Sequence, residues 1–231
     1  CEPSGNLIKR NIVEESGFNL TAHDPHPGFE FLASTDERFR PVNLCAAPDG
    51  SLVIADMYRG LIQHGAYVTP YLREQTLSRK LIAPINYGRI WRIIPDSWNP
   101  VPFQKVSDSP VDTLVSLLNH ANGWQRDMAQ RLLVERRDPS AIKPLLLLIN
   151  QTKNEISRNQ ALWTLEGLGW LNIDVLTSFL ADPSVLVSNT ALRLMEAAIQ
   201  KDKNLQDRIA HQLIDQVKVA PIDRCLQLAL S

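Results

Sequence analysis

The sequence predicts a mixed fold in which an antiparallel β part is followed by an α-helical part. Short apolar runs separated by turn residues fill the first hundred positions, whereas apolar residues recur with helical spacing from position 111 onward. An eight-residue pattern also occurs three times in the second part, which is typical of stacked helical units. These observations indicate one part made of β-strands and a second part made of α-helices.

The β part is predicted to contain five strands, at 6–13, 18–22, 42–46, 51–55 and 89–94. A Glu-Glu-Ser-Gly turn joins the first two, and Pro48-Asp49-Gly50 joins the next two, because Pro presets φ and Gly tolerates positive φ. A propeller blade has about four antiparallel strands, and a propeller has at least about four blades. We therefore expect residues 1–96 to be the last one to two blades of a partial β-propeller, with the remaining blades upstream of this sequence.

Residues 57–87 interrupt the last blade, and all four tyrosines of the chain fall within them. Long connections between strands often carry function, so this insertion could bind a ligand. It could equally be a surface loop held in place by its aromatic side chains. Residues 97–110 are rich in proline and are predicted to form a linker.

From residue 111 to residue 231 the sequence predicts a HEAT-type solenoid of three helix pairs and a truncated fourth. The three octets begin at Arg126, Arg158 and Ser188, and each carries an alanine at its fourth position. A small residue there lets neighbouring helices approach closely, so these alanines are expected to be buried at equivalent places. The predicted first helices of the pairs cover 114–118, 142–149 and 175–180. Because the pattern stops inside a fourth pair, we expect the chain to be a piece of something larger.

Composition narrows the classes of function. The chain has 231 residues, of which 44% are hydrophobic, and its net charge is -1, so no nucleic-acid partner is indicated. No apolar run approaches the roughly 18 residues that span a bilayer. The three cysteines lack metal-type spacing, and the absence of C-x-x-C-H argues against covalent haem in this chain. Cys1 and Cys45 could pair as a disulfide, and the His23-Asp24-Pro25-His26 turn is a weak metal candidate against a solvated loop.

Several uncommon strings occur in an order that resembles a known family. They are Cys1-Glu-Pro-Ser-Gly-Asn-Leu, Met57-Tyr-Arg-Gly-Leu-Ile-Gln-His-Gly and Asn122-Gly-Trp-Gln-Arg-Asp-Met-Ala. The β part resembles the last blade of soluble aldose and sorbosone dehydrogenases, which use pyrroloquinoline quinone (PQQ). The whole chain is more similar to large secreted "membrane-bound dehydrogenase" proteins of planctomycete-type bacteria, which run propeller, HEAT repeats and c-type cytochrome domain. The resemblance implies a periplasmic or secreted protein that passes electrons to a c-type cytochrome domain or protein.

Arg38 and Arg40 are the candidate cofactor-binding residues. Alternation along an extended segment places both guanidinium groups on one face, and guanidinium forks suit carboxylates. In the enzymes that the chain resembles, an Arg-x-Arg at this point contacts PQQ, a planar tricarboxylate. The alternative is a rim ion-pair network with Asp36, Glu37 or Asp56.

Asp56, Tyr58, Arg59 and His64 are candidates for substrate contact or for a structural rim. Arg40 and Asp56 flank the second hairpin almost symmetrically, so an antiparallel register should bring them level, with Arg59 close by. No catalytic residue is assigned, because the resemblance implies that the base His and a cofactor-contacting Lys come from earlier blades.

Two functions follow. One is a fragment of a quinoprotein-like dehydrogenase that oxidises a sugar or alcohol, inactive as this chain alone. The other is a non-enzymatic periplasmic scaffold that binds protein or carbohydrate, because propellers and helical repeats are both recognition platforms and a fold alone does not define a function.

Overall fold

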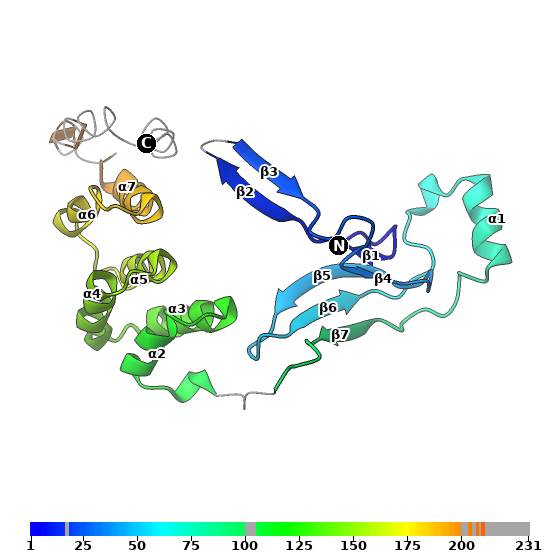
Figure 1. Cartoon of the computed structure of the whole chain (residues 1–231), viewed down its shortest axis with the longest axis horizontal. Coiled ribbons are helices and arrows are strands. Elements are labelled where there is room, and N and C mark those ends of the chain that lie inside the picture. Colours follow the sequence, from blue (N-terminus) through cyan, green and yellow to red (C-terminus); the bar gives the residue numbers. More distant parts are fainter. Residues whose placement is uncertain (17–18, 100–104, 200–202, 205–206, 208, 211–231) are drawn as a thin grey trace. The chain divides into compact units, whose positions relative to one another are not determined.

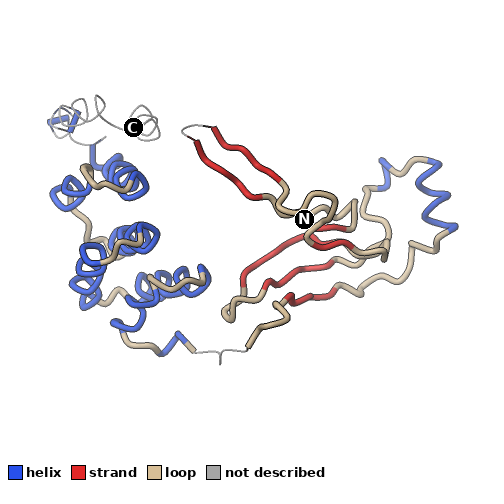
Figure 2. The backbone as a smooth tube through the Cα atoms, in the orientation of Figure 1, coloured by secondary structure: helices blue, strands red, loops and turns tan. Residues whose placement is uncertain are grey.

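The computed structural model describes residues 1–16, 19–99, 105–199, 203–204, 207 and 209–210. The chain forms two compact units, one built on antiparallel sheets and one on packed helices. The order of elements is therefore β followed by α, as the sequence predicted, and Figures 1 and 2 show the strands in the N-terminal part and the helix pairs after it.

The β unit contains three small antiparallel sheets. Their strands are β1 (Leu7–Ile8) with β4 (Leu32–Ala33), β2 (Ile12–Ser16) with β3 (Asn19–His23), and β5 (Pro41–Ala46) with β6 (Leu52–Asp56) and β7 (Arg89–Ile93). The single strand predicted at 6–13 is wrong, because the polar run at 9–11 separates β1 from β2. The short strand β4 was not predicted, since two residues carry no readable alternation.

The sheet of β5, β6 and β7 follows the predicted hairpin and later third strand. Gly50 has φ 84°, and its amide donates to Ala47 O at 3.0 Å, which closes the predicted turn. Asp49 Oδ1 accepts from the amide and hydroxyl of Ser51 at 2.9 and 2.6 Å. The register places Ile54 opposite Leu44 on one side and Trp91 on the other. Ile54 is fully buried at the centre of the sheet.

The insertion between β6 and β7 contains a 3-10 turn (Gly65–Tyr67) and helix α1 (Pro70–Ser78), neither of which was predicted. Thr69 caps α1 by accepting from Leu72 N at 3.1 Å, and Pro70 occupies the first helical turn. A polar cap residue followed by proline is a helix-start signal that is present in the sequence. The helix lacks an apolar stripe, and Thr76 is its buried residue, so periodicity could not reveal it.

The described residues of the helical unit form three helix pairs, in the three places where the sequence predicted a pair. The pairs are α2 (Val111–Leu117) with α3 (Gly123–Arg136), α4 (Ile142–Gln151) with α5 (Glu155–Gly167), and α6 (Ile173–Phe179) with α7 (Val185–Ile199). The second helices stack directly, α3 on α5 and α5 on α7. Ala129, Ala161 and Ala191 are all fully buried, as predicted. The proposed fourth pair, from 205 onward, lies almost wholly outside the described residues.

The repeat is exact in detail at the helix starts. Each octet begins at the fourth residue of its helix, and the residue before each helix is Asn122, Asn154 or Ser184. Asn122 and Asn154 accept from amides in the first turn, at 3.0 Å to Trp124 N and 3.1 Å to Ile156 N.

A polar ladder joins neighbouring second helices. Thr190 Oγ1 donates to Asn159 Oδ1 at 2.6 Å, and one repeat earlier Gln160 Nε2 donates to Asp127 Oδ1 at 3.2 Å. In both cases the third octet position bonds the second position of the preceding octet. The close approach of α3 and α5 also requires Gly167, because a Cβ there would lie 2.6 Å from Val134 Cγ2.

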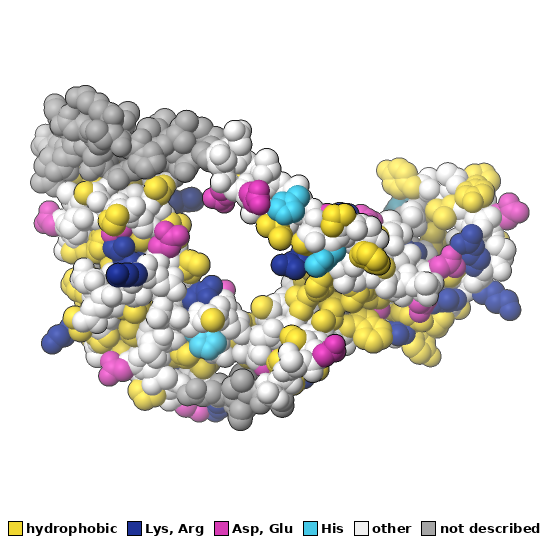
Figure 3. Space-filling model, viewed as in Figure 1, with side chains coloured by type: hydrophobic (Ala, Val, Ile, Leu, Met, Phe, Trp, Pro, Cys, Tyr) yellow, Lys and Arg dark blue, Asp and Glu magenta, His cyan; other side chains and the backbone are white. Residues whose placement is uncertain are grey.

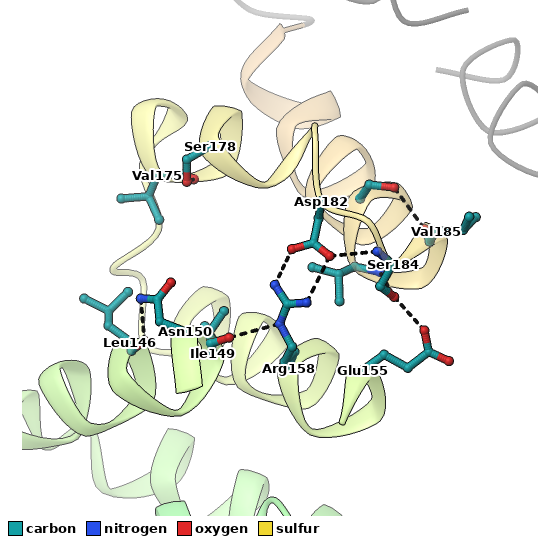
Figure 4. A network of polar contacts seen from close by, with 12 residues as sticks. Leu146, Ile149, Asn150, Glu155, Arg158, Val175, Ser178, Asp182, Ser184 and Val185 are labelled. Carbon is teal, nitrogen blue, oxygen red and sulfur yellow. Dashed lines mark hydrogen bonds and ion pairs between the residues drawn. The ribbon is translucent and has the colours of Figure 1, made fainter. Parts of the chain in front are cut away.

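An ion pair with little solvent exposure links the second and third pairs (Figure 4). Arg158 Nη1 donates to Asp182 Oδ1 at 3.0 Å, Nη2 pairs with Asp182 Oδ2, and Nε donates to Ile149 O at 3.0 Å. Asp182 Oδ1 also accepts from Ser184 N at 2.9 Å. Arg158 therefore holds the end of α4 and the start of α7 to α5.

Trp124 and Trp163, which lie on α3 and α5, are half-buried and lie outside the cluster of fully buried side chains.

Candidate functional site

The candidate site lies at the end of the β5–β6 hairpin, where Arg40 and Asp56 meet as the sequence predicted. Pro41 pairs with Asp56 in the antiparallel register, and Arg40 N donates to Asp56 Oδ1 at 2.8 Å. The ladder slips by one residue between Pro41 and Asn43, so a β-bulge lies beside this contact. The hairpin symmetry therefore located the pair correctly.

Asp56 organises the polypeptide around it. Its side chain also accepts from Tyr58 N at 2.8 Å and from Trp91 Nε1 at 3.0 Å, and the residue is only 3% exposed. A buried carboxylate needs such donors because water cannot solvate it. Asp56 thus holds strand β5, the chain after β6 and strand β7 together, which is a structural role.

Arg40 is buried and donates to four backbone carbonyls. Nε reaches Arg59 O at 2.7 Å, Nη2 reaches Gly60 O at 2.7 Å, and Nη1 reaches Pro3 O at 2.6 Å and Ser4 O at 3.3 Å. Burial lowers the pKa of the guanidinium from its ordinary value. With 8% of the residue exposed and most of its N–H groups bonded, little of the fork is left for a carboxylate. Its arrangement therefore does not favour direct contact with PQQ.

Arg38 engages a different part of the chain. Its Nη2 donates to Lys80 O at 2.8 Å and Ala83 O at 3.0 Å, which fastens the far end of the insertion. The turn before it is capped by Asp36, whose Oδ1 accepts from Arg38 N at 3.0 Å. That backbone hydrogen bond holds the pKa of the Asp36 carboxyl below its ordinary value. The rim ion-pair alternative is wrong for Glu37, which pairs with Arg79 instead of either predicted arginine.

Tyr58 and Arg59 follow Met57 after the end of β6 and lead into a bend at Gly60, a segment that we call the Tyr58–Arg59 turn. Tyr58 has φ 49°, a conformation that is uncommon outside glycine, and the guanidinium carbon of Arg89 lies 3.6 Å from its ring centre. Gly60 is required here because a Cβ would lie 2.4 Å from Leu81 O. The Arg59 carbonyl is held by Arg40, but no hydrogen bond or ion pair engages its guanidinium within the described part of the chain.

His64 has a local structural role. Its Nδ1 accepts from Ala66 N at 3.3 Å, which caps the 3-10 turn, and its ring meets Tyr67 edge-on with 6.1 Å between centres. Both rings are exposed. This arrangement does not bring His64 to Arg40 or Asp56.

An open hollow of about 360 Å³ adjoins the Tyr58–Arg59 turn. It is lined by Met57, Arg59, Leu61, Ile62, Gln63 and Asn86. Asn86 has φ 68°, which asparagine tolerates better than most residues. Gln63 and Asn86 were not predicted as part of a site, because residues 23 positions apart at opposite ends of an insertion share no periodicity. A second, more apolar hollow of about 370 Å³ lies beside α1, between Leu61, Val68 and Leu77.

Within the described part of the chain, the predicted disulfide and the predicted metal site do not form. Cys1 and Cys45 are both free and exposed, so the predicted disulfide is wrong, and Cys225 lies outside the described residues. His23 Nδ1 lies 3.9 Å from Glu14 Oε1, whereas Asp24 pairs with Lys9. Among the described residues, no three His, Cys, Asp or Glu side chains converge as a metal site. Nor does any helix in the described ranges have the length and apolarity needed to span a membrane.

Comparison with known proteins finds one family model that matches the N-terminal part of the chain. Residues 1–97 match the family model "Domain of unknown function (DUF7133)". No curated protein and no solved structure matches the chain. The matched range ends close to the predicted boundary at residue 96 and covers the candidate site completely.

Proposed function

We propose that the protein is a recognition scaffold, in which the β unit completes a β-propeller and the helical unit is a HEAT-type docking array. The observation that carries this proposal is that both faces of the β5–β6–β7 sheet expose large apolar side chains. Neighbouring residues of a strand point to opposite faces, and on β7 both Ile90 and Trp91 are exposed, at 71% and 44%.

A sheet that packs on one side only would have a polar outer face. Here Val42 on β5 and Ile94 just after β7 are exposed as well, and Figure 3 shows apolar side chains at the surface over this region. Blades of a propeller pack against a neighbour on each face, so this pattern suits a blade. Exposed apolar patches on a protein surface often mark a site of interaction with a partner.

The helical unit supports the docking role. Its stacked second helices repeat their caps, buried alanines and polar ladder, and such arrays offer extended surfaces to partners. The sixth octet positions are Arg131, Trp163 and Arg193, which are exposed or half-buried. A row of this composition suits protein recognition, in which arginine and tryptophan are enriched.

The dehydrogenase function stays a prediction that rests on the resemblance alone, together with PQQ, the c-type cytochrome partner and the periplasmic location. Arg38 and Arg40 are the residues that would hold PQQ, and their guanidinium groups donate to backbone carbonyls instead. The structure therefore favours the scaffold. Saturable PQQ binding by the intact protein that Arg38→Gln abolishes would restore the enzyme hypothesis.

Cysteine accessibility tests the scaffold proposal. Ile90→Cys and Trp91→Cys are made separately after Cys1, Cys45 and Cys225 are replaced by serine, and each is labelled with a maleimide. In the intact natural protein both positions should react at least about tenfold more slowly than in this chain alone, because neighbouring blades cover them. Lys80→Cys, at an exposed position of the insertion, is the control that should react equally in both. Fast labelling of either strand position in the intact protein would exclude blades on that face.

A further inference from the structure

We propose that the hollow beside the Tyr58–Arg59 turn binds a small hydroxylated carboxylate such as a sugar acid. The ligand site consists of Arg59, Gln63 and Asn86, with Met57, Leu61 and Ile62 as its apolar wall. This proposal is independent of the propeller and of PQQ, because every lining residue belongs to the loop between β6 and β7.

Hydrogen bonds from buried residues hold the backbone around Arg59 in place. The buried guanidinium of Arg40 holds the carbonyls of Arg59 and Gly60, both at 2.7 Å. Asp56 holds the amide of Tyr58 at 2.8 Å, and Tyr58 keeps its left-handed conformation under Arg89. Strained residues persist where surrounding contacts over-determine them, and such places are enriched at binding sites. Arg40 and Asp56 are therefore positioning residues for Arg59.

The lining has the donors and acceptors that a hydroxylated carboxylate needs. A guanidinium fork binds a carboxylate through two parallel hydrogen bonds, and the Arg59 fork is not engaged by any described residue. The amides of Gln63 and Asn86 can each donate and accept, which suits hydroxyl groups. Gln63 Oε1 accepts from Ile62 N at 3.3 Å, so its side-chain NH₂ remains for a ligand.

The size and polarity of the hollow agree with this ligand class. Its volume of about 360 Å³ is at the small end of the range typical of ligand sites. Met57, Leu61 and Ile62 supply a surface for the apolar face of a sugar ring. The neighbouring hollow beside α1 is more apolar and is lined by Arg73 rather than by amides, so it does not offer the same chemistry.

The test is a titration of the full chain with D-glucuronate, followed by NMR of the Arg59 Nε–H and the Gln63 and Asn86 side-chain amides. Acetate and D-glucose, which carry only the carboxylate or only the hydroxyls, are titrated in parallel. Arg59→Gln removes the fork, and Arg10→Gln is the control because it removes the same charge from an exposed arginine of the same unit.

We expect saturable shifts with glucuronate, weaker binding of acetate and glucose, and a loss of about tenfold or more in glucuronate affinity for Arg59→Gln. Arg10→Gln should change the affinity by no more than about twofold. The proposal is overturned if glucuronate does not saturate, if acetate binds as tightly as glucuronate, or if both variants weaken binding equally. To show that Arg59→Gln folds, its Trp91 indole signal must stay at the position of the unmodified chain.

Discussion

Replacing Arg40 with methionine should destabilise the open end of the β5–β6 hairpin, which lies opposite the Asp49-Gly50 turn. Methionine keeps most of the apolar stem but removes all four hydrogen bonds to backbone carbonyls. Pro3 and Ser4 lie near the chain surface, so water can replace the donors there. Gly60 is buried and Arg59 half-buried, so their carbonyls lose partners that water replaces poorly. At about 1.5–3 kcal/mol for each hydrogen bond to a charged group, the local loss is about 3–6 kcal/mol.

Hydrogen exchange with mass spectrometry is the appropriate assay, because a two-unit chain has no single free energy of unfolding. Peptides covering β5, β6 and the Tyr58–Arg59 turn should exchange much faster in Arg40→Met, whereas peptides from α3 and α5 should not change. Arg38→Met is the matched control, since its more exposed guanidinium donates to Lys80 O and Ala83 O only. That variant should loosen the insertion near Lys80 and leave β5 protected.

Unchanged protection of the hairpin in Arg40→Met would refute the structural reading of Arg40. The guanidinium would then be free to act on a ligand, as the family resemblance implies. If hydrogen exchange of the hairpin increased equally in Arg38→Met and Arg40→Met, the greater burial of Arg40 would not give it a greater role in stabilising the hairpin.

Two further predictions concern the ion pair of the helical unit and the Asp36 turn. Arg158→Met should lower the stability of the helical unit by about 3–5 kcal/mol, because Asp182 is left buried with only the amide of Ser184. Hydrogen exchange of peptides from α4, α5 and α7 measures this change, the double variant with Asp182→Leu should recover part of the loss, and a single-variant change below about 1 kcal/mol would contradict it. The pKa of Asp36 is lowered in the folded state, so its contribution to stability is complete above the ordinary aspartate value of 3.8 and is lost as the pH falls through the folded value. NMR titration of the Arg38 amide should therefore show a midpoint below 3.8 that Asp36→Asn abolishes, and a midpoint at or above 3.8 would be the contrary result.

The helical unit was predictable because its information is local and repeated. Three octets with alanine at one position implied a buried contact at Ala129, Ala161 and Ala191, and all three are fully buried. The hairpin was predictable for a similar reason, since Asp49-Gly50 determines a turn and the turn determines which residues lie level. The contact between Arg40 and Asp56 was predicted from the position of this turn, and the hydrogen bond from Arg40 N to Asp56 Oδ1 confirms it.

The site was less predictable because its contacts are distant in sequence and involve the backbone. Arg40 binds carbonyls near the N-terminus and after β6, and any residue type at those positions could supply a carbonyl. Helix α1 was missed because it buries little apolar surface. Gln63 and Asn86 reach one hollow only because the insertion folds back on itself.

The two roles considered for Arg40 exclude each other. A guanidinium fork binds carbonyl oxygens with the same N–H groups that it would offer to a carboxylate, so an Arg-x-Arg pattern cannot distinguish a backbone contact from a ligand contact. To bind a ligand, Arg40 would have to release the carbonyls of Arg59 and Gly60, and the turn that presents Arg59 would lose its support. Arg59 carries no such cost, because its fork is not engaged by a described residue and already lines a hollow. An anion bound at this end of the sheet should therefore contact Arg59, and its dependence on Arg40 should be indirect.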